Sequence, residues 1–201
     1  ALSVSFFLWA MARFHHQRFG LCAASINGAR RNLLGQARPV LERIGFRWEE
    51  KVSRNEVTVR GGGRENVFYL YGGGDEGSYA SIQGVTLAGV LLDEVGLMPR
   101  SFRCSVAGGR LWFSCNPAGP EHWFYKEWIC RAGEKQTLYL RFSMEDNPAL
   151  SPLVRERYER MFQGTFYRRY VLGEWTAAEG LVYDFFDEKA MPDVPEGGVA
   201  S

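Results

Sequence analysis

The sequence has little of several features that mark whole classes of protein. No apolar run approaches the roughly 20 residues that a membrane-spanning helix needs. Residues 2–11 are apolar but lack the basic front of a signal peptide. The three histidines show no zinc-site spacing and the four cysteines form no Cys-x-x-Cys pair, so reduced thiols are expected. The net charge is only +1, so any surface for nucleic acid has to be a local patch.

The chain does contain an ordinary globular composition in 201 residues, of which 46% are hydrophobic and 23% charged. Short apolar runs alternate with helix-like stretches, which predicts an α/β fold with a mainly parallel sheet flanked by helices. Three short strands between residues 46 and 71 predict a β-hairpin insertion, and Pro39 should interrupt or kink the helix that contains it. The other expected strands are 19–24, 88–94, 111–115 and 136–142, and the expected helices are 2–13, 27–44, 121–130, 152–162 and 166–172.

The most informative motif is the apolar run that ends in Asp93 and Glu94. A continuous apolar run suits a strand that is buried on both faces of a parallel sheet. Because buried acids are costly, we place the two carboxylates at the carboxyl end of the strand, where open α/β sheets bind ligands. In a nucleotide-hydrolysing protein Asp93 would hold Mg²⁺ and Glu94 would polarise the attacking water. The alternative is a strand that ends in a solvated acidic turn.

A second apolar strand ends in polar residues, Ser114 and Asn116. If this strand neighbours the acidic one, Asn116 lies beside the same edge and can hydrogen-bond the attacking water or a γ-phosphate. The alternative is a simple strand followed by an Asn-Pro turn, which is common. The pairing with Asp93 and Glu94 favours the functional interpretation.

Taken together, these segments resemble the large terminase subunit of tailed bacteriophages and prophages. The resemblance is carried by the order and spacing of LLDEVGLMP at 91–99, SCNPAGPEHWFYK at 114–126, DNPALS at 146–151, and GEW at 173–175 followed by EGLVYDFF at 179–186. It covers most of the chain, so it is far more specific than an isolated Asp-Glu pair.

The resemblance implies a fold and a function. The fold is like that of P-loop NTPases, with a small C-terminal helical subdomain. The function is ATP-driven packaging of double-stranded DNA into a capsid, in the cytoplasm of the bacterial host. The implied cofactors are ATP and Mg²⁺, and the implied partners are duplex DNA, the small terminase subunit, the portal of the procapsid and further copies in a ring. The family also carries a metal-dependent nuclease in its C-terminal half.

The resemblance also assigns roles to individual residues. Asp93 matches the magnesium-associated acid, and Glu94 matches the catalytic glutamate. Ser114 and Asn116 match the motif that couples hydrolysis to movement, with Ser114 expected at the nucleotide and Asn116 acting in catalysis. The implied domains are an ATPase core at 1–150, a helical linker subdomain at 151–175 and the start of the nuclease at 176–201. Asp184 and Asp187 receive no catalytic role.

The sequence departs from the family pattern at two places that bear on activity. It contains no Gly-Lys-Ser/Thr phosphate-binding loop, whose backbone N–H groups and lysine cradle phosphates, so poor ATP binding by this fragment is expected. The stretch 101–103 looks shorter than the family's crossover. An inactive prophage remnant and another P-loop nucleic-acid translocase therefore stay as alternatives.

Arginines cluster in the helix that follows the first strand, and Arg30 and Arg31 are the candidates for contact with nucleic acid. A packaging motor has to hold the DNA backbone, and sequence-independent phosphate contacts are the natural means. A solvated helix face is the plain alternative. An arginine finger that reaches a neighbouring subunit's phosphate is another.

Overall fold

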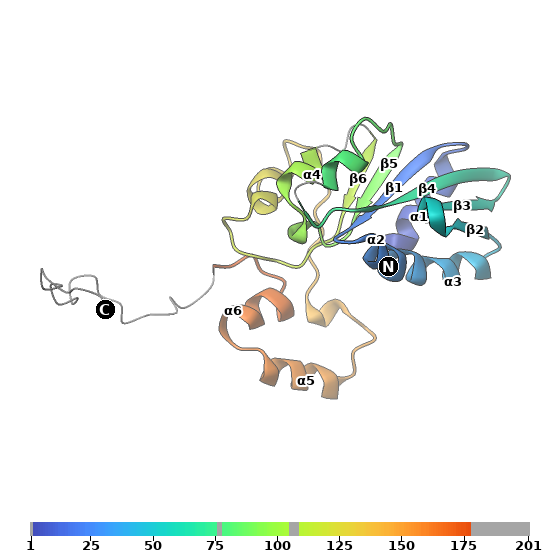
Figure 1. Ribbon diagram of the computed structural model, residues 1–201. Helices are drawn as coiled ribbons and strands as arrows, with labels where there is room; N and C mark the ends of the chain where they lie inside the picture. Colours follow the sequence, from blue (N-terminus) through green and yellow to red (C-terminus); the bar gives the residue numbers. More distant parts are fainter. Residues whose placement is uncertain (1, 76–77, 105–108, 178–201) are drawn as a thin grey trace, which may run out of the picture.

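A six-stranded sheet forms the centre of the molecule. The computed structural model describes residues 2–75, 78–104 and 109–177 (Figure 1). The strand order is β2-β3-β4-β1-β5-β6, and β4, β1, β5 and β6 run parallel to one another. The predicted α/β fold with a mainly parallel sheet is confirmed. The strands are β1 (Arg18–Ala23), β2 (Arg47–Lys51), β3 (Glu56–Gly61), β4 (Arg64–Gly72), β5 (Gly89–Leu92) and β6 (Arg110–Phe113).

The strands between residues 46 and 71 belong to this same sheet. β2 and β3 form an antiparallel hairpin, and β3 pairs antiparallel with β4. β4 then pairs parallel with β1, with Phe68 opposite Phe19. The predicted insertion is therefore the continuation of the sheet at one edge, because β4 supplies a parallel ladder that joins the hairpin to the centre.

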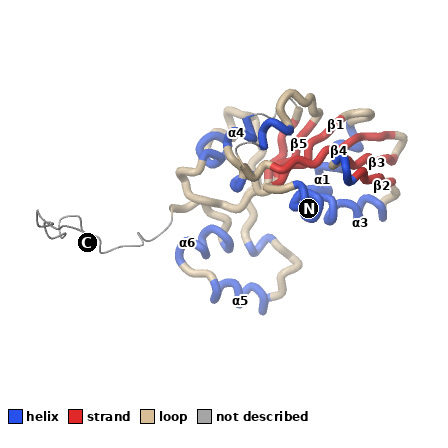
Figure 2. Tube along the Cα trace, viewed as in Figure 1, coloured by secondary structure: helices blue, strands red, loops and turns tan. Residues whose placement is uncertain are grey.

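Helices cover one face of the sheet, while short helices and loops cover the other (Figure 2). The first face carries α1 (Leu2–Arg13), α2 (Ile26–Ala29), the π-helix η1 (Arg30–Leu34) and α3 (Gly35–Arg43). The remaining helical segments are η2 (Val52–Arg54), η3 (Ser78–Ser81), η4 (Val95–Leu97), α4 (Arg100–Cys104), η5 (Tyr125–Ile129), η6 (Met144–Asp146), α5 (Pro152–Met161), α6 (Gly164–Phe166) and η7 (Tyr167–Val171).

The core has two layers because side chains alternate across the sheet. Phe19 and Leu21 of β1 and Leu91 of β5 are buried against α1 and α3. Val90 and Leu92 are buried on the opposite face, in a cluster that includes Cys22, Phe102 and Phe124. Every residue of β5 is buried, as the apolar run predicts.

One sequence prediction about a single element is wrong. Residues 136–142 form no strand: they have no ladder partner among the described residues, and Leu138, Leu140 and Phe142 are exposed. Pro39 does not interrupt its helix, which continues to Arg43, and the hydrogen-bond pattern changes at Arg30–Leu34.

The short crossover between β5 and β6 still permits parallel pairing. Gly89 lies opposite Arg110 and Leu92 opposite Phe113. α4 covers part of this crossover, and residues 105–108 lie outside the described residues. The shortened stretch at 101–103 therefore leaves the strand pair beside Asp93 in place.

The helices α5, α6 and η7 lie apart from the sheet (Figure 1). Their positions match the predicted helices 152–162 and 166–172. Ser151 caps α5 by accepting a hydrogen bond from the backbone N–H of Val154. The segment after η7 is held by Arg169, whose guanidinium donates to the carbonyl of Thr176. The nuclease predicted from 176 onward lies almost wholly outside the described residues.

Candidate functional site

Two strands end side by side and fix the backbone of the acidic motif. The N–H of Asp93 donates to the carbonyl of Cys22 at 2.8 Å, so the pairing with β1 extends past β5. On the other side, the N–H of Ser114 donates to the carbonyl of Leu92 at 3.0 Å. Asp93 and Ser114 therefore stand together at the carboxyl end of the parallel strands.

The hydroxyl of Ser114 connects the two acidic residues. It donates to Oδ1 of Asp93 at 2.5 Å and accepts a hydrogen bond from the backbone N–H of Glu94 at 3.1 Å. A hydroxyl has one donor and two acceptor positions, so it can make both bonds at once. The second oxygen, Oδ2 of the half-buried Asp93, is the atom that we expect to meet a ligand.

Glu94 turns the chain away from the strand in an unusual conformation. Its backbone is left-handed, with φ 52° and ψ 46°. A residue with a Cβ is disfavoured there, and such strain gathers at functional sites. The Glu94 carbonyl accepts from the N–H of Leu97 at 2.8 Å. Its side chain is exposed at the sheet edge.

The loops after the two strands also lie next to each other. The N–H of Val95 donates to the carbonyl of Ser114 at 2.9 Å. A Cβ built on Gly96 would stand 3.9 Å from the carbonyl oxygen of Asn116. The structure thus brings Asp93, Glu94, Ser114 and the exposed Asn116 to one rim, as the strand order requires.

His122 holds this rim to the following segment, a contact that the sequence patterns did not predict. Its Nε2 lies 3.0 Å from the carbonyl of Gly96, and its Nδ1 lies 3.2 Å from the backbone N–H of Phe124. Since the Phe124 N–H donates to Nδ1, the proton is assigned to Nε2, which then donates to Gly96. The only sequence signal was a histidine placed just after a Gly-Pro turn.

The donor set at the rim fits Mg²⁺. Carboxylate and hydroxyl oxygens are the ligands that this ion prefers, and it commonly takes only one or two from the protein. Asp93 has one oxygen bonded to Ser114 and a second oxygen left for a ligand or its water. The described residues contain no cluster of three His, Cys, Asp or Glu, so any ion here would also rely on water and phosphate oxygens.

Neighbouring thiols do not add chemistry to the rim. Burial raises the pKa of Cys115 to about 11. Burial also raises the pKa of Cys22 far above its usual range. Both thiols are therefore protonated near pH 7 and act as small core groups.

Arg30 and Arg31 lie elsewhere, near the carboxyl end of β2 and the start of β3. The guanidinium of Arg30 donates to Glu50 at 2.6 Å and to Asn55 at 3.2 Å. Arg31 is exposed. Three strands separate β2 from β5, so these arginines are on the order of 20 Å from Asp93.

The sheet and the acid pair at its carboxyl edge place the chain among open α/β proteins whose ligands bind at that edge. The family model described as "Terminase large subunit, T4likevirus-type, N-terminal" matches residues 2–190. The chain therefore belongs to the large terminase subunit family. No curated protein matches the sequence.

Solved structures of phage terminases resemble the chain closely. The large terminase from a thermophilic bacteriophage is 47% identical with a TM-score of 0.82, and the match covers 97% of this chain and 50% of that one. The same phage protein in complex with ADP is 46% identical with a TM-score of 0.82, covering 96% and 50%. The ATPase domain of the Thermus phage P74-26 large terminase is 16% identical with a TM-score of 0.57, covering 87% and 82%, and it shows the fold alone.

The chain thus spans about half the length of the first of these proteins. Within the described residues, no helix is both long enough and apolar enough to cross a membrane.

Proposed function

We propose that this chain is the ATPase part of a phage DNA-packaging motor, which hydrolyses ATP to move double-stranded DNA into a capsid. The observation that carries the proposal is the bond from Ser114 to Asp93 beside Glu94, at the carboxyl edge where α/β sheets bind ligands. The relative from the thermophilic bacteriophage is known in complexes with ADP and ATP-gamma-S, which supports a nucleotide at this edge.

In the proposed reaction, a water attacks the γ-phosphorus and the bond to the ADP oxygen breaks, giving ADP and phosphate. The exposed carboxylate of Glu94 orients this water and accepts its hydrogen bond. Asp93, held by Ser114, would bind Mg²⁺ directly or through water. When bound, the ion neutralises the charge on the phosphates.

Asn116 would sense the γ-phosphate and pass its presence on. Its loop contacts Gly96, and the carbonyl of Gly96 is bonded to His122. The ring of His122 lies 6.0 Å from that of Trp175, which follows the helices α5, α6 and η7. We propose an ATPase core at 1–150, a helical linker at 151–175 and a nuclease that begins at 176. This chain of contacts supports a linker that moves with the nucleotide state.

The proposed partners follow from the motor function: duplex DNA, the small terminase subunit, the portal of the procapsid and a ring of further copies. The exposed Arg31 is a candidate for DNA contact, whereas Arg30 is engaged with Glu50. The place of action would be the cytoplasm of the bacterial host.

The test is ATP-dependent packaging of duplex DNA into procapsids by the full-length large subunit that carries this chain, with ATP hydrolysis measured in the same reaction. Asp93→Asn is expected to lose both hydrolysis and packaging. Asn116→Ala is expected to keep part of the hydrolysis but lose packaging, because the γ-phosphate is no longer sensed. Unchanged packaging in both variants would contradict the proposal.

A further inference from the structure

Arginines gather at the opposite end of the sheet from the acidic rim. β1 begins at Arg18, β2 at Arg47, β4 at Arg64 and β6 at Arg110. α1 ends at Arg13, and α3 ends at Arg43, close to the start of β2. Because the parallel strands all begin at this end, the sheet itself aligns these positions. We refer to Arg13, Arg18, Arg43, Arg47, Arg64 and Arg110 as the amino-edge arginines.

Hydrogen bonds confirm that these positions are neighbours across the sheet. The carbonyl of Arg18 accepts from the N–H of Ala88, whose own carbonyl accepts from the N–H of Arg110. The loop after α1 lies against the start of β4, where the N–H of His16 donates to the carbonyl of Glu65 at 2.7 Å. Arg47 of β2 lies opposite Arg60 of β3.

The positive charge of this edge is largely uncompensated. Two carboxylates close to it, those of Glu49 and Glu65, both bond the guanidinium of Arg60. In the described part of the chain, none of the amino-edge arginines forms an ion pair. All are exposed except Arg64, which is half-buried.

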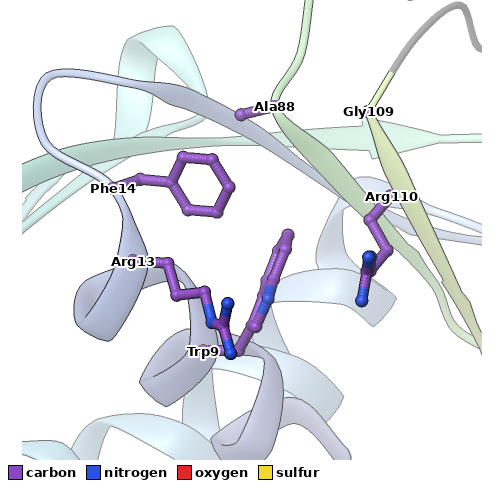
Figure 3. A pocket seen from close by; sticks show the side chains of 6 residues that line it. All are labelled: Trp9, Arg13, Phe14, Ala88, Gly109 and Arg110. Carbon is purple, nitrogen blue, oxygen red and sulfur yellow. The ribbon is translucent and has the colours of Figure 1, made fainter.

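The surface of this edge is hollowed. One hollow of about 380 Å³ lies between α1 and the starts of β5 and β6. In it, Arg13 and Arg110 flank the ring of Trp9 (Figure 3). A second hollow of about 490 Å³ is lined by Arg47 and Arg64, among others. Four of the amino-edge arginines, Arg13, Arg47, Arg64 and Arg110, therefore line hollows in this surface.

We infer that this amino edge binds the phosphate backbone of duplex DNA, an inference that rests on the proposed function. Six strands give the row a width of about 24 Å, which suits an extended polyanion better than a compact ligand. A peptide partner would need exposed apolar side chains on this edge to anchor it. The ring of Trp9, however, is packed against Phe6 and Trp112. Contacts to phosphate carry no sequence information directly, so this binding is expected to be independent of sequence.

The inference separates the DNA surface from the nucleotide site. β5 has four residues between the amino edge and Asp93, a distance of about 13 Å along the strand. The same two strands thus carry the nucleotide rim at one end and the DNA surface at the other. Arg54, which follows the carboxyl end of β2, lies at the other end of the sheet and serves as a control.

The test measures binding of a fluorescently labelled duplex of about 24 base pairs to the 201-residue chain by anisotropy, at several salt concentrations. The edge triple variant Arg13→Ala, Arg47→Ala, Arg110→Ala removes three exposed, unpaired charges. Each lost phosphate contact lowers the slope of log K against log salt by about 0.9. The edge triple is therefore expected to lower the slope by about 2 to 3 and weaken binding at least about tenfold.

The matched control is the triple variant Arg54→Ala, Arg157→Ala, Arg160→Ala, which removes the same charge from exposed positions elsewhere. It is expected to keep the wild-type slope, and replacing the three edge arginines by lysine is expected to keep it too. If the edge triple does not fold, each single arginine-to-alanine variant is measured instead. Each is expected to lower the slope of log K against log salt by about 0.9.

Three outcomes overturn the inference. If the wild type binds DNA with a salt-dependent slope and the edge triple keeps that slope, the chain binds DNA but not through the amino edge. If the edge triple no longer binds a glutamate-rich peptide that the wild type binds, but still binds DNA, the partner of this edge is an acidic protein. If the wild type binds no duplex at all, the proposed motor function fails with the inference.

Discussion

The hydroxyl of Ser114 donates a hydrogen bond of 2.5 Å to Oδ1 of Asp93 and so links two strands that are adjacent only in the folded sheet. The bond is charge-assisted, a kind that is shorter and stronger than a bond between neutral groups. It fixes the orientation of the carboxylate before any ligand arrives.

Removing this hydroxyl is expected to destabilise the fold and release the carboxylate. Ser114→Ala should lower the free energy of unfolding by about 1 to 3 kcal/mol, because a half-buried carboxylate loses a charge-assisted bond. Urea unfolding of the chain measures the change. Ser114→Thr keeps the hydroxyl and serves as control; equal losses in both variants would show that the bond contributes nothing.

Because the backbone of Glu94 is left-handed, a glycine at this position is expected to stabilise the fold relative to alanine, although both substitutions remove the catalytic carboxylate. Glu94→Gly and Glu94→Ala both delete the carboxylate, but only alanine keeps a Cβ at φ 52°. We expect the glycine variant to unfold with a free energy about 1 kcal/mol higher than the alanine variant. A glycine variant that is less stable than the alanine variant would mean that the backbone is unstrained there.

The two arginines after α2 are expected to differ in their effect on stability. Arg30→Ala removes bonds to Glu50 and Asn55 and should lower the free energy of unfolding by about 1 to 2 kcal/mol. Arg31→Ala, at an exposed position, should change it by less than about 0.5 kcal/mol. Equal unfolding midpoints in urea for the two variants would argue against the Arg30–Glu50 pair.

The cysteines provide a pH-dependent probe of the fold. Burial raises the pKa of Cys115 from 9.0 to about 11, so the folded protein keeps this thiol protonated where the unfolded chain ionises it. The stability contributed by the protonated thiol is complete below pH 9 and is lost as the pH rises from about 9 to 11.

Alkylation by iodoacetamide at about pH 8.5, followed by peptide mass spectrometry, checks this in a Cys104→Ser background. The exposed Cys130 should react first, Cys115 much more slowly and the buried Cys22 only after unfolding. Rapid labelling of Cys22 in the folded protein would show that β1 is not central in the sheet.

The sequence predicted the acidic rim because its signal is local. The apolar run before Asp93 could be read as a strand buried on both faces, and the position of the acids follows from the cost of burying charge. The bond from Ser114 could not be predicted, since it depends on the register between β5 and β6. The pairing of Arg30 with Glu50 likewise joins residues that only the sheet brings together.

The errors have a common physical cause. Residues 136–142 have apolar side chains typical of a strand, but a strand also needs a neighbour for its backbone, and the described residues supply none. The hairpin was assigned to an insertion because local patterns do not tell which strand lies beside β4. Likewise, the amino-edge arginines are scattered along the sequence and become one surface only through the strand order.

Steady-state hydrolysis of ATP by Glu94→Gln in the full-length large subunit, alongside equilibrium binding of ATP, tests the assignment of the catalytic rim most directly. The amide keeps the size of the side chain but cannot polarise the attacking water. We predict that turnover falls at least about a hundredfold, while the affinity for ATP stays within about threefold. Turnover at the wild-type rate would contradict the assignment of this rim as the site of hydrolysis.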